Sequence, residues 1–401
     1  MRDSRSFVDA ATPAVADVLT EMTRIVLTGG GVVHPGLTMV ERDGAMTVRC
    51  TDSADAAPDQ PLFDVPREVL IPVDGAKWAD SRSELVLTEP PPALTPRQRD
   101  LLDLHVALYN AGGKLPCIVA SHPRLGFRDA PDVVAAVQAL RPGFTEADVE
   151  THNQALKAPS PHNPDSNEPP AIQVFLGTRV FGLKPVEAAD PETTRAPTHA
   201  NQRVLMTLID LLNHHPRGAP YRVDARAMTP AVARPKGTDE CFAHYGHRRD
   251  SLDLALNYGY VDTETRFVHC PPMTVDVPGV GTLRILGRGA RGKPPSPLDP
   301  PRVTSNPDGL TLSHIVFRQP KRGVRWELPV FMAVQARALQ LGADPAGAGA
   351  AANQAVATIM ESATELMWDL RTVAGSAAAN NPAAEVLAAV AEHQLGLLHN
   401  G

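Results

Sequence analysis

Thirty-nine prolines in 401 residues are the feature that most constrains what this chain can fold into. Proline has no backbone N–H to donate, so it interrupts both the interior of a helix and the ladder of a sheet. Aromatic residues make up only 4% of the chain. We therefore expect an irregular fold with much loop and little regular strand ladder. The chain is longer than one that usually forms a single hydrophobic core, so we expect two packed units or one core with a large insertion.

Composition excludes several kinds of partner and site. The formal net charge of −7 and the lack of a run of Lys and Arg argue against binding to nucleic acid. The four cysteines lie far apart without a C-x-x-C pair, which favours reduced thiols over a disulfide framework or a cysteine zinc site. No stretch approaches the apolar length of a membrane span, so a soluble cytoplasmic protein with no membrane partner is expected.

The first part of the chain has a β-rich start followed by helices. Strands are predicted at residues 24–27, 38–40 and 46–50, with an extended, proline-punctuated piece at 63–73. Helices are predicted from Thr95 to the glycine pair at 112–113, at 133–140 and at 146–156.

The rest of the chain alternates loops with apolar stretches and ends in helices. Exposed loops are predicted at 159–170 and 188–201, on either side of a strand-like stretch at 171–183. A Gly- and Pro-rich region at 287–309 is typical of a hinge. Beyond it, two sets of apolar residues each fall on one helical face: Val356, Ile359, Met360, Leu366, Leu370 and Val373, then Val386, Leu387, Val390 and Leu397. These alanine-rich helices could pack within one chain or between two.

An apolar run at 204–212 ends abruptly at Asn213-His214. This ending brings two polar side chains to the edge of a core, where they could contact a ligand or simply form a turn. The histidines at 214, 215, 244 and 247 show no ligand spacing such as H-E-x-x-H, so no metal site is expected.

Taken in order, several short motifs resemble those of the SET-domain methyltransferases, in the branch typified by the Rubisco large-subunit methyltransferase. Asn213-His214 resembles that family's Asn-His motif. The stretch "DECFAHYGHRRDSLDLALNYGYVD" is similar to its acidic turn, strand, Tyr-Gly, polar loop, short helix and second Tyr-Gly. The segments "HPGLTMVERDG", "FDVPREVLIPVD", "GTRVF" and "ELPVFMAVQARALQL" resemble further family segments in the same order, so the resemblance covers residues 24–345.

The resemblance implies an α+β fold with SET-type β-folds, a pseudoknot, a helical insert and a C-terminal helical domain. The corresponding segments are 1–94 for the N-terminal part of the SET domain, 95–170 for the helical insert, 171–270 for the C-terminal part with the pseudoknot, and 271–401 for a helical substrate-binding domain.

The resemblance also implies roles for individual residues around a channel shared by S-adenosylmethionine and an acceptor. Tyr258 falls on the family's catalytic phenol, and Tyr245 is implied as a wall of the same channel. The cofactor-binding residues are implied to be Gly36, Leu37, Arg179, Asn213 and His214, with Arg179 on the methionine carboxylate.

Three motifs depart from the family pattern. Val33 and His34 stand where the family's cofactor loop has an acid and its first glycine. Residues 249–252 read Arg-Asp-Ser-Leu in place of Ser-Asn-Ala-Glu, and the Asn-His motif lacks the customary following serine. These changes concern how the methionine end is held and which acceptor is used.

The expected function is that of an S-adenosylmethionine-dependent N-methyltransferase of the SET class. Its acceptor would be an amine nitrogen, either a protein lysine or a small-molecule amine. Two alternatives stay open: a non-catalytic SET-like module that binds a partner, and S-adenosylmethionine chemistry other than methyl transfer.

Overall fold

The computed structural model describes residues 3–51, 61–126, 130–142, 168–183, 202–235, 237–246, 248–287, 296–317 and 325–399. The predicted helix at 146–156 and the predicted loop at 188–201 lie outside these residues, as does most of the loop at 159–170. The chain divides into two compact units: Met1–Val119 with Thr151–Gly246, and Ala120–Glu150 with His247–Gly401. The four segments that the family resemblance implies, 1–94, 95–170, 171–270 and 271–401, stay a prediction.

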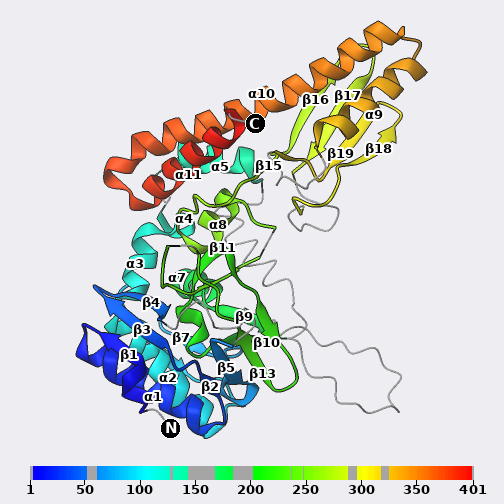
Figure 1. Cartoon of the computed structure of the whole chain (residues 1–401). Coiled ribbons are helices and arrows are strands. Elements are labelled where there is room, and N and C mark those ends of the chain that lie inside the picture. The colour runs from blue at the N-terminus through cyan, green and yellow to red at the C-terminus, as the bar shows by residue number, and fades with distance from the viewer. Residues whose placement is uncertain are drawn as a thin grey trace. The chain divides into compact units, whose positions relative to one another are not determined.

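The first unit contains short strands and a few helices, labelled in Figure 1. Its helical elements are η1 Ser4–Phe7, α1 Pro13–Thr28, η2 Arg67–Val69, α2 Pro96–Ala111, α3 Lys114–Ser121, α7 Pro170–Gly177 and η3 Ile209–Leu211. Its strands are β1 Val8–Ala10, β2 Val32–Val33, β3 Leu37–Arg42, β4 Ala45–Cys50, β5 Phe63–Pro66, β6 Ile71–Pro72, β7 Lys77–Trp78, β8 Leu87–Glu89, β9 Val180–Leu183, β10 Gln202–Leu205, β11 Asn213–Ala219, β12 Tyr221–Val223, β13 Ala227–Pro230 and β14 Phe242–Ala243.

These strands form several small sheets, in agreement with the expectation from proline content. The sheets have the orders β1-β3-β4, β6-β10-β9, β12-β13-β5-β2, β11-β14 and β7-β8. Strand β4 continues its pairing beyond β3, because Arg49 also forms a bridge with Glu240. The strands predicted at 38–40 and 46–50 are confirmed as parts of β3 and β4.

Two strand predictions in this unit are wrong. Residues 24–27 belong to helix α1, because Leu19, Met22 and Val26 continue a buried face with helical spacing from the preceding residues. Residues 170–177 form helix α7 instead of the first half of a strand. Its apolar run is buried on nearly all sides. The periodicity of such a run cannot tell a buried helix from a buried strand.

The second unit combines a four-stranded sheet with long helices (Figure 1). Its helical elements are α4 Pro123–Gly126, α5 Pro131–Leu140, α8 Ser251–Tyr258, α9 Glu327–Gln340, α10 Pro345–Ala377, η4 Ala378–Asn380 and α11 Pro382–His399. Its strands are β15 Val268–His269, β16 Met273–Val277, β17 Gly281–Leu286, β18 Arg302–Asn306, β19 Gly309–Ser313 and β20 Val316–Phe317. Strands β16–β19 form a sheet of order β16-β17-β19-β18. Strand β18 lies inside the Gly- and Pro-rich region at 287–309 that was expected to be a hinge, because its backbone pairs with β19. The α+β class and the helical C-terminal region are confirmed.

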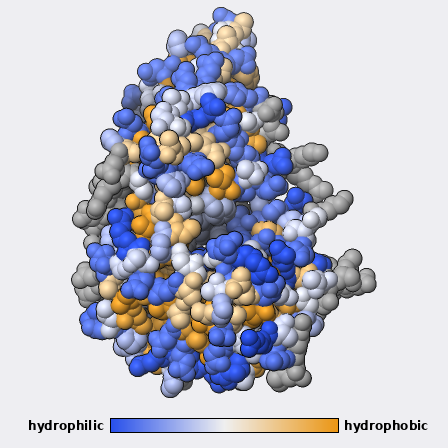
Figure 2. Space-filling model, turned by 90° about the vertical axis from the view of Figure 1, so that its left-hand side faces the viewer, coloured by the Kyte–Doolittle hydropathy of each residue, from blue (hydrophilic) through white to orange (hydrophobic). Residues whose placement is uncertain are grey.

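Helix α10 buries a line of small residues against its neighbours α9, α11 and α5. The buried positions are Ala348, Ala352, Ala355, Ile359, Ala363, Met367, Leu370 and Ala374. Small side chains let the helix axes approach closely. The predicted face is confirmed, with Ile359 and Leu370 buried and its other members partly buried against the same core, but the prediction missed the alanines. On the face of the molecule seen in Figure 2, hydrophobic groups form small patches between hydrophilic ones. No helix among the described residues has the length and apolar character needed to cross a membrane.

We expect Ala355→Leu to lower the free energy of unfolding by about 1–3 kcal/mol, because Ala355 is fully buried in the α10 packing. Ala357→Leu is the matched control, since Ala357 is exposed on the same helix and has room for a larger side chain. Urea unfolding of both variants measures the difference. Equal stability of the two would contradict the tight packing of this line.

Candidate functional site

A short turn, η3, is the centre of the site in the first unit. Leu208, just before it, has a left-handed backbone with φ 62°, which is uncommon for a residue with a branched side chain. The turn leaves two carbonyl groups to be satisfied from elsewhere. Arg179 Nη1 donates to the Asp210 carbonyl at 3.1 Å, and the Tyr245 hydroxyl donates to the Leu212 carbonyl at 2.7 Å. The turn therefore joins two of the predicted site residues.

Asn213 and His214 follow this turn directly and begin strand β11, which pairs in parallel with β14. His214 Nδ1 accepts a hydrogen bond from the Tyr245 backbone N–H at 2.9 Å, and the two rings lie 5.1 Å apart. Asn213 Nδ2 donates to Glu240 Oε1 at 2.9 Å. The structure therefore brings Arg179, Asn213, His214 and Tyr245 together around residues 208–214.

Arg179 lies in an aromatic and polar environment. Its guanidinium carbon is 5.5 Å from the ring centre of Tyr109 and 5.9 Å from that of Phe175. The Tyr109 hydroxyl donates to Asp210 Oδ2. Arg179 Nε and Asp210 Oδ1 are both buried without a hydrogen-bond partner among the described residues. Such buried orphan atoms are uncommon and indicate a place where a ligand or water completes the bonding.

Lys114 lies near this group. Burial, together with the neighbouring positive charge of Arg179, lowers the pKa of the Lys114 ammonium to about 8. Two basic side chains in one partly desolvated region favour a negatively charged group.

The loop before β3 is organised by His34. The imidazole Nδ1 accepts a hydrogen bond from the Gly36 backbone N–H at 3.1 Å and lies 3.4 Å from Cys50 Sγ. Leu37 is fully buried and pairs with Cys50 across β3 and β4. A buried imidazole therefore closes the turn at the position where the family pattern has its first glycine.

Strand β4 connects this loop with the segment that precedes Tyr245. The Cys50 N–H donates to the Asp239 carbonyl at 2.9 Å, and the Cys241 N–H donates to the Val48 carbonyl at 2.7 Å. The Asn213 side chain also lies 3.5 Å from the Met46 carbonyl. Residues 36–37 are thus linked to Asn213 through β4 within the same unit.

Tyr258 belongs to the second unit, where it is the last residue of helix α8. Its hydroxyl accepts a hydrogen bond from Arg249 Nη1, and the Arg249 guanidinium carbon lies 5.1 Å from the Tyr258 ring centre. Gly259 ends the helix with φ 75°, a conformation that favours glycine. Convergence of Tyr258 with the four residues of the first unit stays a prediction.

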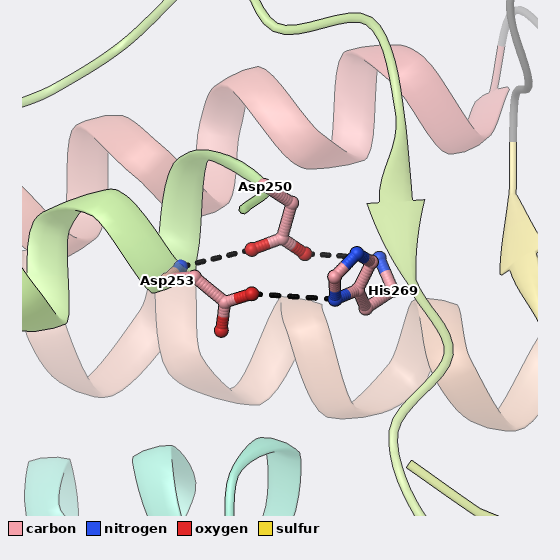
Figure 3. A group of neighbouring side chains, drawn as sticks. All are labelled: Asp250, Asp253 and His269. Carbon is pink, nitrogen blue, oxygen red and sulfur yellow. Dashed lines mark hydrogen bonds and ion pairs between the residues drawn. The ribbon is translucent and has the colours of Figure 1, made fainter. Parts of the chain in front are cut away.

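A buried ion cluster fixes the start of α8, and three of its members are drawn in Figure 3. Asp250 caps the helix by accepting from the Asp253 N–H at 2.9 Å, and it also accepts from the His269 N–H at 2.9 Å. Arg141 binds Asp250 at 2.6 Å and Asp253 at 2.9 Å, while His269 Nδ1 lies 3.2 Å from Asp253 Oδ2. In segment 249–252, where the sequence differs from the family motif, Asp250 therefore supplies the hydrogen bonds.

The charges of this cluster compensate one another. Burial opposes the charge of Arg141, but Asp250 and Asp253 outweigh it and raise the pKa of the guanidinium. Burial likewise opposes the charge of Asp253, but Arg141 and His269 outweigh it and lower the pKa of the carboxyl. Asp250, Asp253 and His269 have the spacing of metal ligands, yet Arg141 already occupies both carboxylates. A buried guanidinium in that position disfavours a divalent cation, so we interpret the group as structural.

His122 packs against the end of α8. A Cβ added to Gly259 would lie 3.0 Å from His122 Cδ2, and Arg124 Nη2 donates to Asn257 Oδ1 at 3.1 Å. Burial, with a contribution from the charge of Arg124, lowers the pKa of His122 to about 3. The imidazole beside Gly259 is therefore neutral in the folded protein.

Sequence reasoning missed several residues of these groups. Asp210 carried a readable signal, because it is the lone acid inside the apolar run at 204–212. Asp250 also had one, since an Asp before an apolar helix is a typical N-cap. Arg141, Tyr109 and His269 had none, because their partners are more than fifteen residues away in sequence.

Similar solved structures include two of the same kind of protein. The crystal structure of the SET domain of LSMT bound to lysine and AdoHcy has a TM-score of 0.44 and 12% identity, over 97% of this chain and 90% of that one. The structure of Rubisco LSMT bound to sinefungin and monomethyllysine has a TM-score of 0.43 and 11% identity, over the same shares. No protein-family model and no curated protein matches the chain. Because these scores and identities are low, we base the function on the residues of this chain.

We expect Arg141→Met to lower the free energy of unfolding by about 3–5 kcal/mol, because it leaves two buried carboxylates without their cation. Arg371→Met is the matched control, since Arg371 pairs with Glu392 on the surface, where an ion pair contributes about 0–1 kcal/mol. Denaturant unfolding at pH 7 measures both changes. A loss for Arg141→Met as small as that of the control would contradict the structural role of the cluster.

The free energy of unfolding should also decrease as the pH is lowered, because of His122. An unfolded histidine has a pKa near 6.5, whereas His122 in the fold has a pKa of about 3. Between these values the unfolded chain binds a proton that the folded chain does not, so the free energy of unfolding decreases as pH falls from about 6.5 towards 3. His122→Gln should flatten this dependence between pH 7 and 5, measured by urea unfolding. His399→Gln, at an exposed histidine of α11, should leave it unchanged; a wild-type slope in the first variant would refute the assignment.

Proposed function

We propose that this chain is an S-adenosylmethionine-dependent methyltransferase of the SET type. The observation that carries the proposal is the η3 turn. Its two carbonyls are held by Arg179 and Tyr245, and it leads directly into Asn213 and His214. The motif order in the sequence assigned these four residues to the cofactor channel. The parallel pairing of Asn213 and His214 with residues 242–243 supports the proposed pseudoknot.

The residues present fit the methionine end of the cofactor. Arg179 has a buried Nε without a partner, and it makes no ion pair with any acid among the described residues. A carboxylate would supply that partner through a charge-assisted hydrogen bond, which arginine makes well. Lys114, partly buried beside it, would add to the attraction for the same negative charge. The His34-ordered loop at 34–37 would present backbone groups to the cofactor in place of an acid.

The cofactor supplies a methyl group on a positively charged sulfur. In the transfer, the bond from sulfur to the methyl carbon would break as the bond from the acceptor nitrogen forms. The sulfur would become neutral, and the nitrogen would take the positive charge and release it as a proton to water. The displacement needs alignment more than acid–base help, with reacting atoms about 3–3.5 Å apart. Carbonyl oxygens and a tyrosine hydroxyl can hold the polarised methyl hydrogens by weak C–H···O contacts. Tyr258 is proposed for that position and for orienting the acceptor.

The proposed acceptor is an amine nitrogen of a protein lysine or a small molecule. An amine attacks through its lone pair, so it must arrive neutral, although a free lysine has a pKa near 10.4. Desolvation and nearby positive charge both favour the neutral amine. The positive sulfur of the cofactor provides part of that charge.

The second candidate is a non-catalytic module that binds a partner. Helix α9 favours it, because Leu328, Met332 and Leu339 are 61%, 59% and 44% exposed at near-helical spacing. In that case the residues around η3 would have no cofactor to hold, so cofactor binding separates the two candidates.

We expect calorimetry to show binding of S-adenosylmethionine, weakened about tenfold or more by Arg179→Gln through loss of a charge-assisted hydrogen bond. Arg226→Gln, at an exposed arginine of the same unit, should bind like the wild type. Tyr258→Phe should retain the cofactor but lose transfer of labelled methyl to a mixture of lysine peptides and small amines. Absence of binding to the wild type would exclude the enzyme and favour the binding module.

A further inference from the structure

We propose that Tyr109 is a positioning residue that keeps the charge of Arg179 available for the carboxylate of the cofactor. It does so by holding the neighbouring acid, Asp210, so that the arginine and the acid do not neutralise each other. This inference rests on the proposed function, because it explains how the arginine proposed for that carboxylate avoids a competing acid. The family motifs did not assign Tyr109 to the site.

Arg179 and Asp210 are close neighbours, yet they form no ion pair. Arg179 Nη1 donates to the backbone carbonyl of Asp210 at 3.1 Å, which places the guanidinium next to the residue that carries the carboxylate. Within the described part of the chain, Arg179 Nε and Asp210 Oδ1 are both buried and both lack a hydrogen-bond partner. A buried donor and a nearby buried acceptor normally pair, because an unpaired buried polar atom is costly. Other contacts must therefore hold the two groups apart.

The carboxylate is held by Tyr109. The phenol O–H donates to Asp210 Oδ2, and the tyrosine itself is buried in helix α2. Its ring packs edge-on against that of Phe175 with 5.0 Å between the ring centres, and it lies 5.7 Å from the imidazole of His105. His105 Nδ1 is in turn 2.8 Å from the Leu101 carbonyl of the same helix. The direction of the carboxylate is therefore set from α2.

The guanidinium is held by aromatic rings. Its carbon lies 5.5 Å from the ring centre of Tyr109 and 5.9 Å from that of Phe175, distances at which a ring attracts a cation. Tyr109 thus contacts both members of the pair, the acid through its O–H and the arginine through its ring. The phenol does not neutralise the arginine itself, because burial and the charge of Asp210 raise the pKa of Tyr109 well above its ordinary value.

Loss of the phenol O–H should let the pair collapse. In Tyr109→Phe both rings remain, but Asp210 Oδ2 loses its donor and becomes a buried acceptor without a partner. Arg179 already bonds the backbone of that residue, so its guanidinium can turn to the carboxylate. A charge-assisted hydrogen bond of this kind is strong, and the carboxylate of the cofactor would have to displace it. Binding therefore weakens, although the substitution removes none of the proposed cofactor contacts.

Four forms of the full chain test the inference by calorimetry with S-adenosylmethionine: the wild type, Tyr109→Phe, Asp210→Asn and the double variant. We expect Tyr109→Phe to weaken binding about tenfold or more, as one charge-assisted hydrogen bond requires. Asp210→Asn removes the competing charge, so that variant and the double variant should both bind within about threefold of the wild type. Tyr221→Phe is the matched control, since its ring also packs edge-on against a phenylalanine, Phe181, at 5.8 Å, and it should bind like the wild type.

Rescue by the second substitution separates positioning from a merely structural role. If Tyr109 only stabilised the fold, the double variant would bind no better than Tyr109→Phe, because two structural losses add. That result would overturn the inference, and so would wild-type binding by Tyr109→Phe. Circular dichroism checks that each variant is folded.

NMR without the cofactor tests the same pairing independently of the proposed function. A hydrogen bond to a carboxylate moves an N–H proton signal downfield. In the wild type, the Nε proton of Arg179 should therefore lie upfield of that of Arg141, whose Nε donates to Asp253 at 2.9 Å. The Arg179 signal, assigned by its absence in Arg179→Gln, should move downfield in Tyr109→Phe and return in the double variant.

The wild-type spectrum keeps the inference testable even if Tyr109→Phe does not fold. An Arg179 signal as far downfield as that of Arg141 in the wild type, or an unchanged signal in a folded Tyr109→Phe, would overturn the inference. Failure of S-adenosylmethionine to bind the wild type, with the expected NMR shifts present, would count against the proposed function alone.

Discussion

The site in the first unit depends on two backbone carbonyls that have no partners of their own. A turn as short as η3 cannot satisfy its own groups by helical hydrogen bonds, and a buried carbonyl without a partner is costly. Arg179 and Tyr245 satisfy them from two distant segments of the chain. The same requirement that stabilises the turn therefore brings together the side chains that the proposed cofactor needs.

The second unit uses buried charge for a comparable purpose. Arg141, Asp250 and Asp253 would be expensive to bury singly, and they are buried together with His269 because each charge has a partner. An apolar replacement could be as stable, so stability alone does not account for the cluster. Its effect is to fix the first turn of α8 and hence the direction in which Tyr258 and Arg249 extend.

The sequence predicted best where a pattern was local and long. The helix that ends at the glycine pair, strands β3 and β4 and the C-terminal helices were all indicated by spacing and end signals. Prediction failed at residues 24–27 and 170–177, where short apolar runs could be read as strand or helix. At 24–27 one buried face continued from the preceding residues, whereas at 170–177 burial on nearly all sides, which depends on the neighbours in space, left no clear helical period. The alanine line of α10 was missed because alanine is a weak signal of a buried face.

The sequence by itself determined the candidates for the site, because the order of short motifs assigned Arg179, Asn213, His214, Tyr245 and Tyr258 to it as a prediction. It could not determine what holds them, since the partners of these groups come from residues far away along the chain. Tyr109 beside Asp210 and Arg141 beside Asp250 are each separated by more than a hundred residues. Only the tertiary structure decided these pairings, because a hydrogen bond depends on distance in space, whereas sequence patterns record only neighbours along the backbone.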